Sequence, residues 1–512
     1  MNNKDRSARS GNDRAPVAGT DAGERQRRTD LLLDHLGQLL PPGQRAAFRT
    51  ASTTPPPASL RLNPLVAPPD ELRAALERRG TATAWCPDAY TLDRHEVRLG
   101  HSLEHAVGAV YVQAKAATLA VEVLAPQPGE RVLDMAAAPG GKAIQIAARM
   151  RNSGLLVLND MQSQRMPALV GNLERCGVAN AAITRLDGNR MAQYFHNYFD
   201  RILLDAPCSG DGILRKDTGL LSYWSVEDAR RQAQHQKGLL RAAFHMLRPG
   251  GVLVYSTCSL SLEENEEVLL GLLSKAADKV EIMPVEQGPE QPLPAAIAAR
   301  FPAALARCSR VWPHLEATEG AFVARLRKLA STEWPRCSGD VREWTAAAAG
   351  AGEAEAEQLA GVVTDLESQW GFSLDSKLPA AFASKKKNLT LQPAAAAALG
   401  RGCPGFVRAG MRVARRHRDH YFLSQQAVAM WGRSMQRAQL ALTWSQTAEL
   451  FRAGEIRLEP AAVPRGEVIC RYGPFALCRA IAYAEDQRLD AMLPRPLMRD
   501  ELTRIADYPG AE

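Results

Sequence analysis

The feature that most limits the fold of this chain is a regular alternation of short apolar strands and helices between about residues 108 and 330. The strand-like runs are RVLDM (131–135), LLVLND (155–160), RILLDAP (201–207) and GVLVYSTC (251–258). Helical stretches separate them, and the longest runs from about 226 to 247. Such repetition is typical of a parallel, doubly wound sheet. We therefore predict an α/β, doubly wound Rossmann-like core over residues 108–330.

The segments outside this core differ in composition and predict four further regions. Residues 1–28 are rich in Arg, Asp, Gly and Ala, which predicts a disordered basic tail. Residues 29–107 combine helical runs with the strand-like LRLNPL (60–65) and predict a small N-terminal α+β domain. Residues 331–400, with the Ala-rich AAAAGAGEAEAEQ, predict a helical connector. Residues 401–512, where Gly and Pro punctuate short apolar runs, predict a β-rich domain.

The bulk composition is that of a globular, mildly basic protein. The formal net charge of +7 permits a phosphate-rich partner but does not require one. The 9 cysteines form no CxxC pair, so the sequence predicts no zinc or other metal site and indicates a reducing compartment. No apolar run reaches the length of a membrane span, and the N-terminus lacks the apolar segment of a signal peptide. We expect a cytoplasmic monomer without membrane association.

A glycine-rich loop, LDMAAAPGGK (133–142), follows the first predicted strand of the core. Glycine lets the backbone approach a ligand closely, and the helix that follows offers free N–H groups at its N-terminus. In doubly wound sheets, ligands bind at the carboxyl ends of such strands. The loop is neither GxGxxG nor GxxxxGK[ST], which disfavours a dinucleotide oxidoreductase and a phosphate cradle.

Aspartates at successive strand ends accompany this loop. Asp160 ends the second strand and is placed to accept hydrogen bonds from ribose hydroxyls, and Asp187 follows the third and is placed to accept from an adenine amino group. These acids suit a sulfonium nucleoside that carries no phosphate. The alternative is that each Asp only caps the next helix or turn. The sequential register of the acids with the glycine-rich loop favours the ligand site.

Two cysteine-bearing loops follow neighbouring strands, DAPCSGDG (205–212) and YSTCSL (255–260). Both should lie at the edge of the sheet where the glycine-rich loop lies, whereas structural thiols are mostly buried and inert. Carbon 5 of cytosine is a poor nucleophile, but attack of a thiolate on carbon 6 activates it toward an electrophilic methyl group. This chemistry needs a thiolate, a group that stabilises charge and a base, for which Cys258, Asp205 and Cys208 are the candidates. The alternative is two buried thiols and a capping Asp.

The motifs DMAAAPGGK, LLDAPCSGDG and VYSTCSLSLEENE resemble those of the RsmB/RsmF (Sun-type) family of RNA cytosine-5 methyltransferases. The resemblance is strong over about residues 108–328, and GAVYVQ (108–113), NLERCG (172–177) and VWPHLEATEGAFVA (311–324) extend it. It implies that S-adenosylmethionine is the cofactor and that RNA is the substrate. The target cytosine would be flipped out or unpaired, because a stacked base cannot enter such a site.

The resemblance also implies a role for each motif residue. The S-adenosylmethionine site would be lined by Ala136, Ala137, Ala138, Pro139, Gly140, Gly141, Lys142, Asp160, Asp187 and Asp205. Cys258 would be the nucleophile that forms the adduct with carbon 6, and Cys208 would assist proton removal and product release. Asp205 would also lie near the target base. The family often has Cys at the position of Ala136 and Thr at that of Ala143, and the missing hydroxyl at 143 would weaken a hydrogen bond at the helix start.

The order of the regions resembles the RsmF branch of the family. That branch implies a PUA-like RNA-binding domain at 401–512 and small-subunit ribosomal RNA, or the assembled subunit, as partner. Residues 401–418 hold six arginines and no acid, and are candidate phosphate contacts. One alternative is a catalytically silent RNA-binding or assembly factor, which the presence of both cysteines and all three acids disfavours. Another is the same chemistry on transfer RNA or DNA.

Overall fold

The computed structural model describes residues 22–92, 98–215, 224–290, 292–334, 341, 353–373, 380–385, 387–418, 420–459 and 464–508. Helix α1 spans Ala22–Gly37, so the prediction of a disordered tail up to residue 28 is wrong for residues 22–28. Its first turns are stabilised by pairs one helical turn apart, such as Arg28 Nε to Glu24 Oε1 at 2.8 Å. Residues 1–21 of the predicted tail lie outside the described residues.

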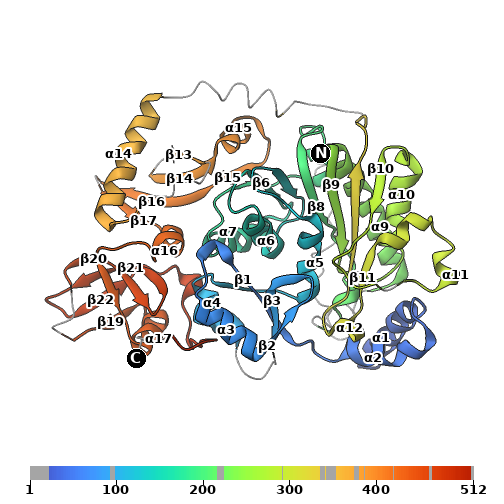
Figure 1. Ribbon diagram of the computed structural model, residues 1–512, viewed down its shortest axis with the longest axis horizontal. Helices are drawn as coiled ribbons and strands as arrows, with labels where there is room; N and C mark the ends of the chain where they lie inside the picture. Colours follow the sequence, from blue (N-terminus) through green and yellow to red (C-terminus); the bar gives the residue numbers. More distant parts are fainter. Residues whose placement is uncertain are drawn as a thin grey trace, which may run out of the picture.

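Nine strands of the described chain form the central sheet, in the order β10-β12-β9-β8-β5-β6-β7-β15, with β11 also paired to β12. Their bounds are β5 Arg131–Asp134, β6 Leu155–Asn159, β7 Ala181–Thr184, β8 Phe199–Asp205, β9 Leu247–Thr257, β10 Val280–Met283, β11 Ser309–Val311, β12 Ala321–Lys328 and β15 Phe406–Ala409. Strands β5 to β9 pair in parallel, and the outer strands pair antiparallel. The predicted doubly wound α/β fold is confirmed (Figure 1).

Helices cover both faces of this sheet. Helices α5 (Lys115–Leu124), α6 (Gly141–Arg149) and α7 (Met166–Arg175) pack on one face, and α8 (Gly188–Met191), α9 (Val226–Met246) and α10 (Glu266–Ala276) pack on the other. Neighbouring strand residues therefore enter different cores: Val132 packs with the first set and Leu133 with the second. Because both faces are buried, the parallel strands are almost continuously apolar.

The strand order reverses beside β5. The chain builds β5, β6 and β7 outward in one direction and then returns to place β8 and β9 on the other side of β5. Ligands of open α/β sheets bind at such a switch point, outside the carboxyl ends of the strands. Here β5 ends at Asp134 and β8 ends at Asp205, so two aspartates lie at the switch point.

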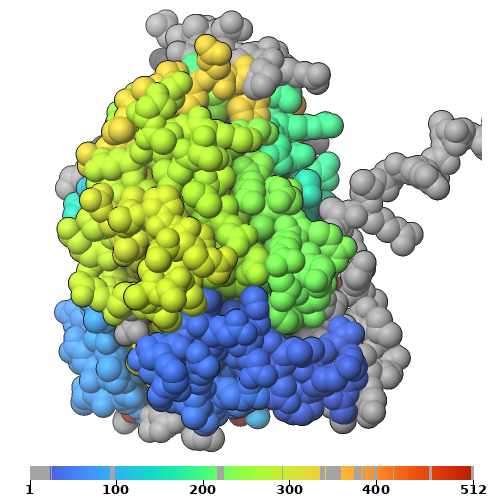
Figure 2. Space-filling view, turned by 90° about the vertical axis from the view of Figure 1, so that its right-hand side faces the viewer, coloured from blue at the N-terminus to red at the C-terminus, as the bar shows by residue number. Residues whose placement is uncertain are grey.

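A smaller N-terminal sheet has the order β2-β3-β1-β4. Its strands are β2 Gly80–Thr83, β3 Cys86–Leu92, β1 Ala58–Leu62 and β4 Val110–Val112, beside α3 (Asp70–Arg79). Strand β4 lies beyond residue 107, so this sheet extends past the predicted end of the N-terminal domain. Ahead of it, α1 and α2 (Arg45–Thr53) pack through Phe48 against Trp312 of the core. Figure 2 shows this blue layer against the yellow and green surface of the core.

The C-terminal part contains two further sheets. One has the order β13-β14-β16-β17 and the other β18-β20-β21-β22-β19. Their bounds are β13 Ala380–Lys385, β14 Asn388–Pro393, β16 Met411–His417, β17 His420–Leu423, β18 Gln439–Ala441, β19 Glu455–Arg457, β20 Gly466–Tyr472, β21 Phe475–Tyr483 and β22 Arg488–Ala491, with helices α14 Glu353–Trp370, α15 Ala394–Gly402, α16 Gln425–Trp431 and α17 Trp444–Ala453. The prediction of a β-rich C-terminal region is confirmed.

The predicted helical connector at 331–400 is only partly helical. Helix α14 fits it, but β14 is a strand that pairs with β13 on one side and with β16 on the other, so residue 400 does not separate two structural units. The alternation of buried Leu389 and Leu391 with half-buried neighbours in β14 is a strand pattern, which the Ala-rich surroundings obscured. Strand β15, which belongs to the predicted C-terminal domain, pairs with β7 at the edge of the central sheet.

The end of the chain closes onto the N-terminal domain. The Glu104 carboxylate is buried, and its Oε1 accepts hydrogen bonds from Ile505 N at 2.9 Å, Ala506 N at 3.3 Å and Tyr508 Oη at 2.7 Å. One apolar cluster correspondingly contains residues of both chain ends, such as Leu60 and Tyr508. In the part of the chain that the structure describes, no helix has both the length and the apolar character to cross a membrane.

Candidate active site

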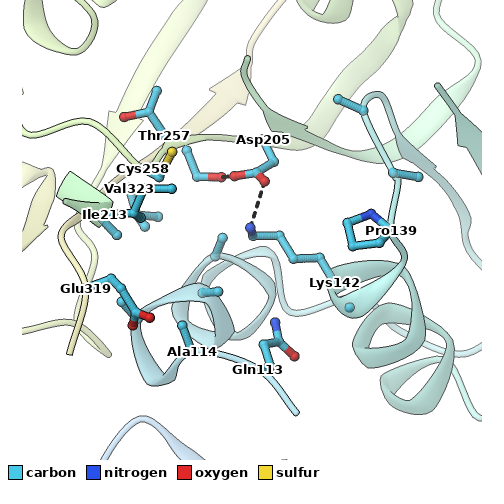
Figure 3. Close-up of a pocket in the computed structure, with 18 of the residues that line it drawn as sticks. Gln113, Ala114, Pro139, Lys142, Asp205, Ile213, Thr257, Cys258, Glu319 and Val323 are labelled. Carbon is cyan, nitrogen blue, oxygen red and sulfur yellow. Dashed lines mark hydrogen bonds and ion pairs between the residues drawn. The ribbon is translucent and has the colours of Figure 1, made fainter. Parts of the chain in front are cut away.

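A cavity of about 540 Å³ opens at the carboxyl ends of β5, β8 and β9 (Figure 3). Of the residues predicted for the site, it is lined by Ala136, Ala137, Ala138, Pro139, Gly141, Lys142, Asp205 and Cys258. Gln113 and Ala114, before α5, and Glu319, before β12, form other parts of its wall. The switch point of the sheet thus brings together the glycine-rich loop and both cysteine loops, although of the two cysteines only Cys258 lines the cavity.

Backbone contacts and backbone conformation hold the glycine-rich loop in place. Ala137 N donates to Asn159 O at 2.8 Å. Gly140, directly before α6, has a φ of 112°, a conformation that side chains rarely adopt. A Cβ atom at Gly141 would lie 2.9 Å from Tyr111 Cε1, so a larger residue there would push against the cavity wall. The two glycines therefore set the turn from which α6 begins.

Asp160 and Asp187 are not among the residues that line the cavity. Asp160 is buried and accepts hydrogen bonds from Ala138 N at 3.1 Å and Gln162 N at 2.9 Å, so it holds the glycine-rich loop against the end of β6. Asp187 accepts from Asn189 N at 2.9 Å and caps α8. In this structure both carboxylates therefore bind backbone N–H groups, as the alternative of capping residues predicts. Their contact with a cofactor stays a prediction.

Lys142 and Asp205 form an ion pair inside the cavity, with Nζ 2.7 Å from Oδ2 (Figure 3). Ser256 Oγ donates to the other oxygen of Asp205 at 2.8 Å. Burial opposes the charge of Lys142, but the Asp205 carboxylate outweighs that effect and raises the pKa of Lys142. A fixed positive charge and a fixed carboxylate thus face the same space. The sequence predicted both residues for the site but not their pairing.

Asp134, at the end of β5, is a site residue that the sequence reasoning missed. It lines the cavity, and only 1% of it is exposed. Burial, together with the charge of Asp205, raises its pKa to about 7. Its place at the end of the first strand is the signal that could have identified it, because Asp205 ends β8 in the same way.

We expect Asp134→Asn to stabilise the protein, because the folded state must otherwise ionise a buried acid. The pKa of Asp134 is about 7 in the folded chain and 3.8 in the reference state, so between these values the folded protein binds more protons and loses stability as pH rises. The difference in the free energy of unfolding between variant and parent should be near zero at pH 4 and grow to roughly 4 kcal/mol above pH 7. Denaturant unfolding at pH 4, 5.5 and 8 measures it. An equal difference at all three pH values would contradict the assignment.

The two cysteine sulfurs meet at one side of the cavity. Cys258 Sγ lies 2.7 Å from Cys208 Sγ, and both side chains are half-buried free thiols. The hydrogen bond with Cys258 and burial together raise the pKa of Cys208 well above its ordinary value. Either sulfur can donate in this hydrogen bond, and Cys258 is the one of the two cysteines that lines the cavity. The sequence predicted this convergence, and the structure places the atoms accordingly.

The cavity places two thiols beside a pair of charges. Cys258 lines it, Cys208 lies next to Cys258, and Lys142 and Asp205 form a fixed ion pair, so the groups suit covalent catalysis by a sulfur with electrostatic stabilisation. Among the residues that the structure describes, no group of three or more His, Cys, Asp or Glu side chains is arranged to hold a metal ion.

Comparison with protein families matches two parts of the chain. The family described as 16S rRNA methyltransferase RsmB/F matches residues 121–327, and the one described as the N-terminal domain of 16S rRNA methyltransferase RsmF matches residues 31–115. The first match contains the glycine-rich loop and both cysteine loops.

Curated relatives are similar over nearly the whole chain. The ribosomal RNA small subunit methyltransferase F of Enterobacter sp. (strain 638) is 34% identical over 462 residues, which cover 89% of this chain and 92% of that relative. The protein of the same name from Vibrio parahaemolyticus is 31% identical over 488 residues, which cover 92% of this chain and 98% of that relative.

Solved structures share the fold. A methyltransferase homolog protein from Pyrococcus horikoshii is 30% identical, with a TM-score of 0.53 over 60% of this chain and 100% of that chain. NSun6 from the same organism, solved with SFG, has a TM-score of 0.51 at 21% identity, over 59% of this chain and 98% of that one, and so shows the fold alone. The sheet and the cavity thus occur in a scaffold known from methyltransferases.

Proposed function

The chain belongs to the RsmB/F family of S-adenosylmethionine-dependent RNA methyltransferases, and from this premise we propose that it methylates carbon 5 of a cytosine in small-subunit ribosomal RNA. We place it in the cytoplasm as a monomer. The observation that carries the proposal is the pair of sulfur atoms 2.7 Å apart beside the glycine-rich loop, because a cysteine nucleophile with a second thiol at its side suits attack on a pyrimidine ring.

The residues of the cavity fit the cofactor. S-Adenosylmethionine carries a sulfonium charge, and the cavity presents Asp134 and Asp205 against the single cation of Lys142. Its volume of about 540 Å³ lies within the range of small-molecule sites. We assign the cofactor to the loop from Ala136 to Lys142 with Asp205, and to Asp160 and Asp187 beyond the cavity. When bound, it supplies an electrophilic methyl group.

In the proposed reaction, the Cys258 thiol first gives its proton to water, and the resulting thiolate attacks carbon 6 of the cytosine. A bond forms between the sulfur and carbon 6, and the electrons of the double bond between carbons 5 and 6 move toward carbon 5 and the polar atoms of the base that are conjugated with it. Lys142 and Asp205 face that space as a fixed pair of charges, and they orient the base and stabilise the charge that develops on it. After carbon 5 has received the methyl group, its proton must leave before the Cys258 sulfur can depart.

Cys208 is suited to accept that proton late in the reaction. Before attack, its hydrogen bond with Cys258 is the largest cause of its raised pKa. Once Cys258 is bonded to the base, this hydrogen bond is weakened, and Cys208 can lose its proton to water. The resulting thiolate then takes the proton from carbon 5, and Cys258 leaves with the electrons of its bond to carbon 6.

Transfer of a labelled methyl group tests the function. The protein is incubated with S-adenosylmethionine labelled in its methyl group and with small subunits, deproteinised small-subunit RNA or transfer RNA, and the RNA is digested to nucleosides. We expect label in 5-methylcytidine from the ribosomal RNA samples. Label only in transfer RNA would favour the same chemistry on another substrate. RNA binding without any label would favour a silent assembly factor.

We infer that RNA also contacts a basic groove next to the C-terminal β-rich region, which we propose to be PUA-like. The groove, of about 690 Å³, lies between α7 and the C-terminal sheets. Its basic side chains include Arg175, Arg412, Arg415 and Arg479, of which Arg479 is paired with Glu467, and His417 and Phe422 supply its rings. Arg408 from the same Arg-rich segment is paired with Glu174 and is less available. Cations with an aromatic ring suit the phosphates and bases of RNA. The N-terminal α+β domain is a second candidate RNA contact.

Charge reversal in this groove should weaken RNA binding in a salt-dependent way. For Arg412→Glu combined with Arg415→Glu, we expect the slope of log K against log [KCl] to become shallower by about 2, because each lost phosphate contact removes about one released counterion. Fluorescence anisotropy of a labelled ribosomal RNA fragment at several KCl concentrations measures the slope. Arg452→Glu on α17, whose guanidinium lies outside the groove near Glu449, is the control and should leave it unchanged. An unaltered slope in the double variant would remove the groove from the RNA path.

A further inference from the structure

The two loops that carry the sulfurs are tied to each other by buried carboxyl groups. Asp211 lies three residues after Cys208, and Glu264 lies six residues after Cys258. Only 4% of Asp211 and 0% of Glu264 are exposed. Neither residue lines the cavity, so neither touches the space in which the reaction is proposed to occur.

Asp211 extends from the Cys208 loop to the Cys258 loop. Its Oδ1 accepts from Leu260 N at 2.6 Å, and its Oδ2 accepts from Ser259 Oγ at 2.8 Å. Ser259 directly follows Cys258, so these bonds fix the backbone on the C-terminal side of the nucleophile.

Glu264 makes the reciprocal connection. Its Oε1 accepts from Ser209 N at 2.9 Å, and its Oε2 accepts from Ser209 Oγ at 2.5 Å. Ser209 directly follows Cys208. Gln236 on α9 donates from Nε2 both to Glu264 Oε1 at 2.9 Å and to Pro207 O at 2.8 Å, and so holds the loop on both sides of Cys208.

The loops also touch through their backbones. Gly212 N donates to Cys258 O at 3.0 Å. A Cβ atom at Gly212 would lie only 2.6 Å from that oxygen, so the approach requires a glycine. The sulfur-bearing loops therefore cannot shift past each other without breaking several of these contacts.

The two acids are placed where burial opposes their charge. Burial raises the pKa of Asp211, and burial together with the neighbouring Asp211 raises the pKa of Glu264 to about 7. Buried carboxyls destabilise a fold unless their hydrogen bonds offset the loss of hydration. Most partners of these two acids are on the opposite cysteine loop; the exceptions include Ser209 Oγ, which lies 3.4 Å from Asp211 Oδ2, and Gln236, which donates to Glu264. The two acids therefore link the loops at their junction.

We propose that Asp211 and Glu264 are positioning residues that form a reciprocal brace, each standing on one sulfur-bearing loop and holding the other, so that Cys208 and Cys258 stay at reacting distance. The brace acts on the site described above and rests on the proposed function only for its effect on turnover. Its effect on the distance between the sulfurs is independent of any methyl transfer.

The first test measures that distance by oxidation with diamide. Diamide takes two electrons and two protons from a thiol pair and leaves a disulfide, which peptide mass spectrometry assigns to Cys208 and Cys258. In the parent protein the reaction should be fast, because the sulfurs are already adjacent. We expect it to slow by about tenfold or more in Asp211→Ala and in Glu264→Ala, since misplacement by about 1 Å costs a proximity-dependent step this much. An unchanged rate in both variants overturns the brace, whatever the reaction of the enzyme.

The second test separates positioning from general stability. We expect Asp211→Ala to lower kcat by about 10- to 100-fold while the KM values for RNA and cofactor stay within about twofold. Asp211→Asn should recover part of the loss, because its carbonyl oxygen can still accept from Leu260 N. Glu104→Ala is the matched control, since it removes an equally buried carboxyl with three hydrogen bonds far from the sulfurs. It should lower Tm but leave kcat unchanged.

Two outcomes of the second test count against the proposal. One is an equal kcat in Asp211→Ala and Glu104→Ala, which reduces Asp211 to a structural residue. The other is no recovery in Asp211→Asn. If Asp211→Ala or Glu264→Ala fails to fold, Ser209→Ala and Ser259→Ala are used instead, because each removes a single hydroxyl that binds one of these two acids. The same slowing of diamide oxidation is expected of both, and parent-like rates in both contradict the brace.

Discussion

Replacing Cys258 by alanine is expected to abolish methyl transfer to RNA. The Cys258 sulfur is the nucleophile of the proposed reaction, and no other cysteine is among the described residues that line the cavity. Carbon 5 of cytosine then stays unactivated, so kcat should fall by about 10⁴-fold or more, as for other enzymes that lose their nucleophile. Single-turnover transfer of labelled methyl groups to ribosomal RNA measures the loss.

Binding and folding should survive this change. Cys258 is half-buried and Ala fits its place, so Tm and the affinity for S-adenosylmethionine should stay close to those of the parent. Cys308→Ala removes another half-buried thiol of the same domain and serves as the control, with full activity expected. Turnover by Cys258→Ala within tenfold of the parent would overturn the covalent mechanism.

The central fold could be predicted from the sequence because its strands are buried on both faces. Runs such as LLVL in residues 155–158 are apolar throughout, and each is followed by a helical stretch, so the parallel sheet could be identified without knowledge of its strand order. The meeting of the two cysteines followed from the same rule. Each lies just after a parallel strand, and the carboxyl ends of parallel strands share one edge.

The side-chain partners at that edge could not be predicted in the same way. Asp160 and Asp205 both stand at strand ends, yet Asp160 binds backbone amides whereas Asp205 pairs with Lys142 in the cavity. The difference lies in the path of the chain after each strand, which sets where a carboxylate points. Asp134 was not predicted as a site residue because its proximity to Asp205 depends on β5 and β8 being neighbours in the sheet, and the sequence does not give the strand order.

Composition misled the prediction at two segments. Residues 22–28 have few apolar groups, but pairs such as Glu24 with Arg28 support a helix whose apolar residues come later, at Leu32 and Leu36. Strands β13 and β14 lie in an Ala-rich region whose local signal is weak. They form because β14 pairs with β16, a contact between distant residues that no local pattern encodes.

Replacing Cys208 by alanine is expected to trap the reaction as a protein–RNA adduct. Once Cys258 has given its own proton to water, its attack and the methyl transfer to carbon 5 need no further proton acceptor, whereas loss of the carbon-5 proton does. Without the second sulfur, which lies 2.7 Å from the first, the methylated base should stay bonded to Cys258. Denaturing gels of protein mixed with S-adenosylmethionine and labelled ribosomal RNA should show a slowly migrating band that survives heating in detergent. Release of product should be slowed by about 10²- to 10⁴-fold, the usual contribution of a positioned base.

Matched variants decide whether the band is this adduct. The double variant Cys208→Ala with Cys258→Ala should show none, because the attacking sulfur is gone. Omission of S-adenosylmethionine should also prevent its accumulation, because attack without methyl transfer is reversible and the unmethylated base is released. A band in the double variant would place the covalent bond on another residue. Normal turnover by Cys208→Ala without a band would assign proton removal to another group that faces the cavity, of which Asp134, Asp205 and Glu319 are the carboxyl candidates. The chemistry of the site thus depends on which of two adjacent sulfurs holds the base and which receives the proton, and these variants separate the two roles.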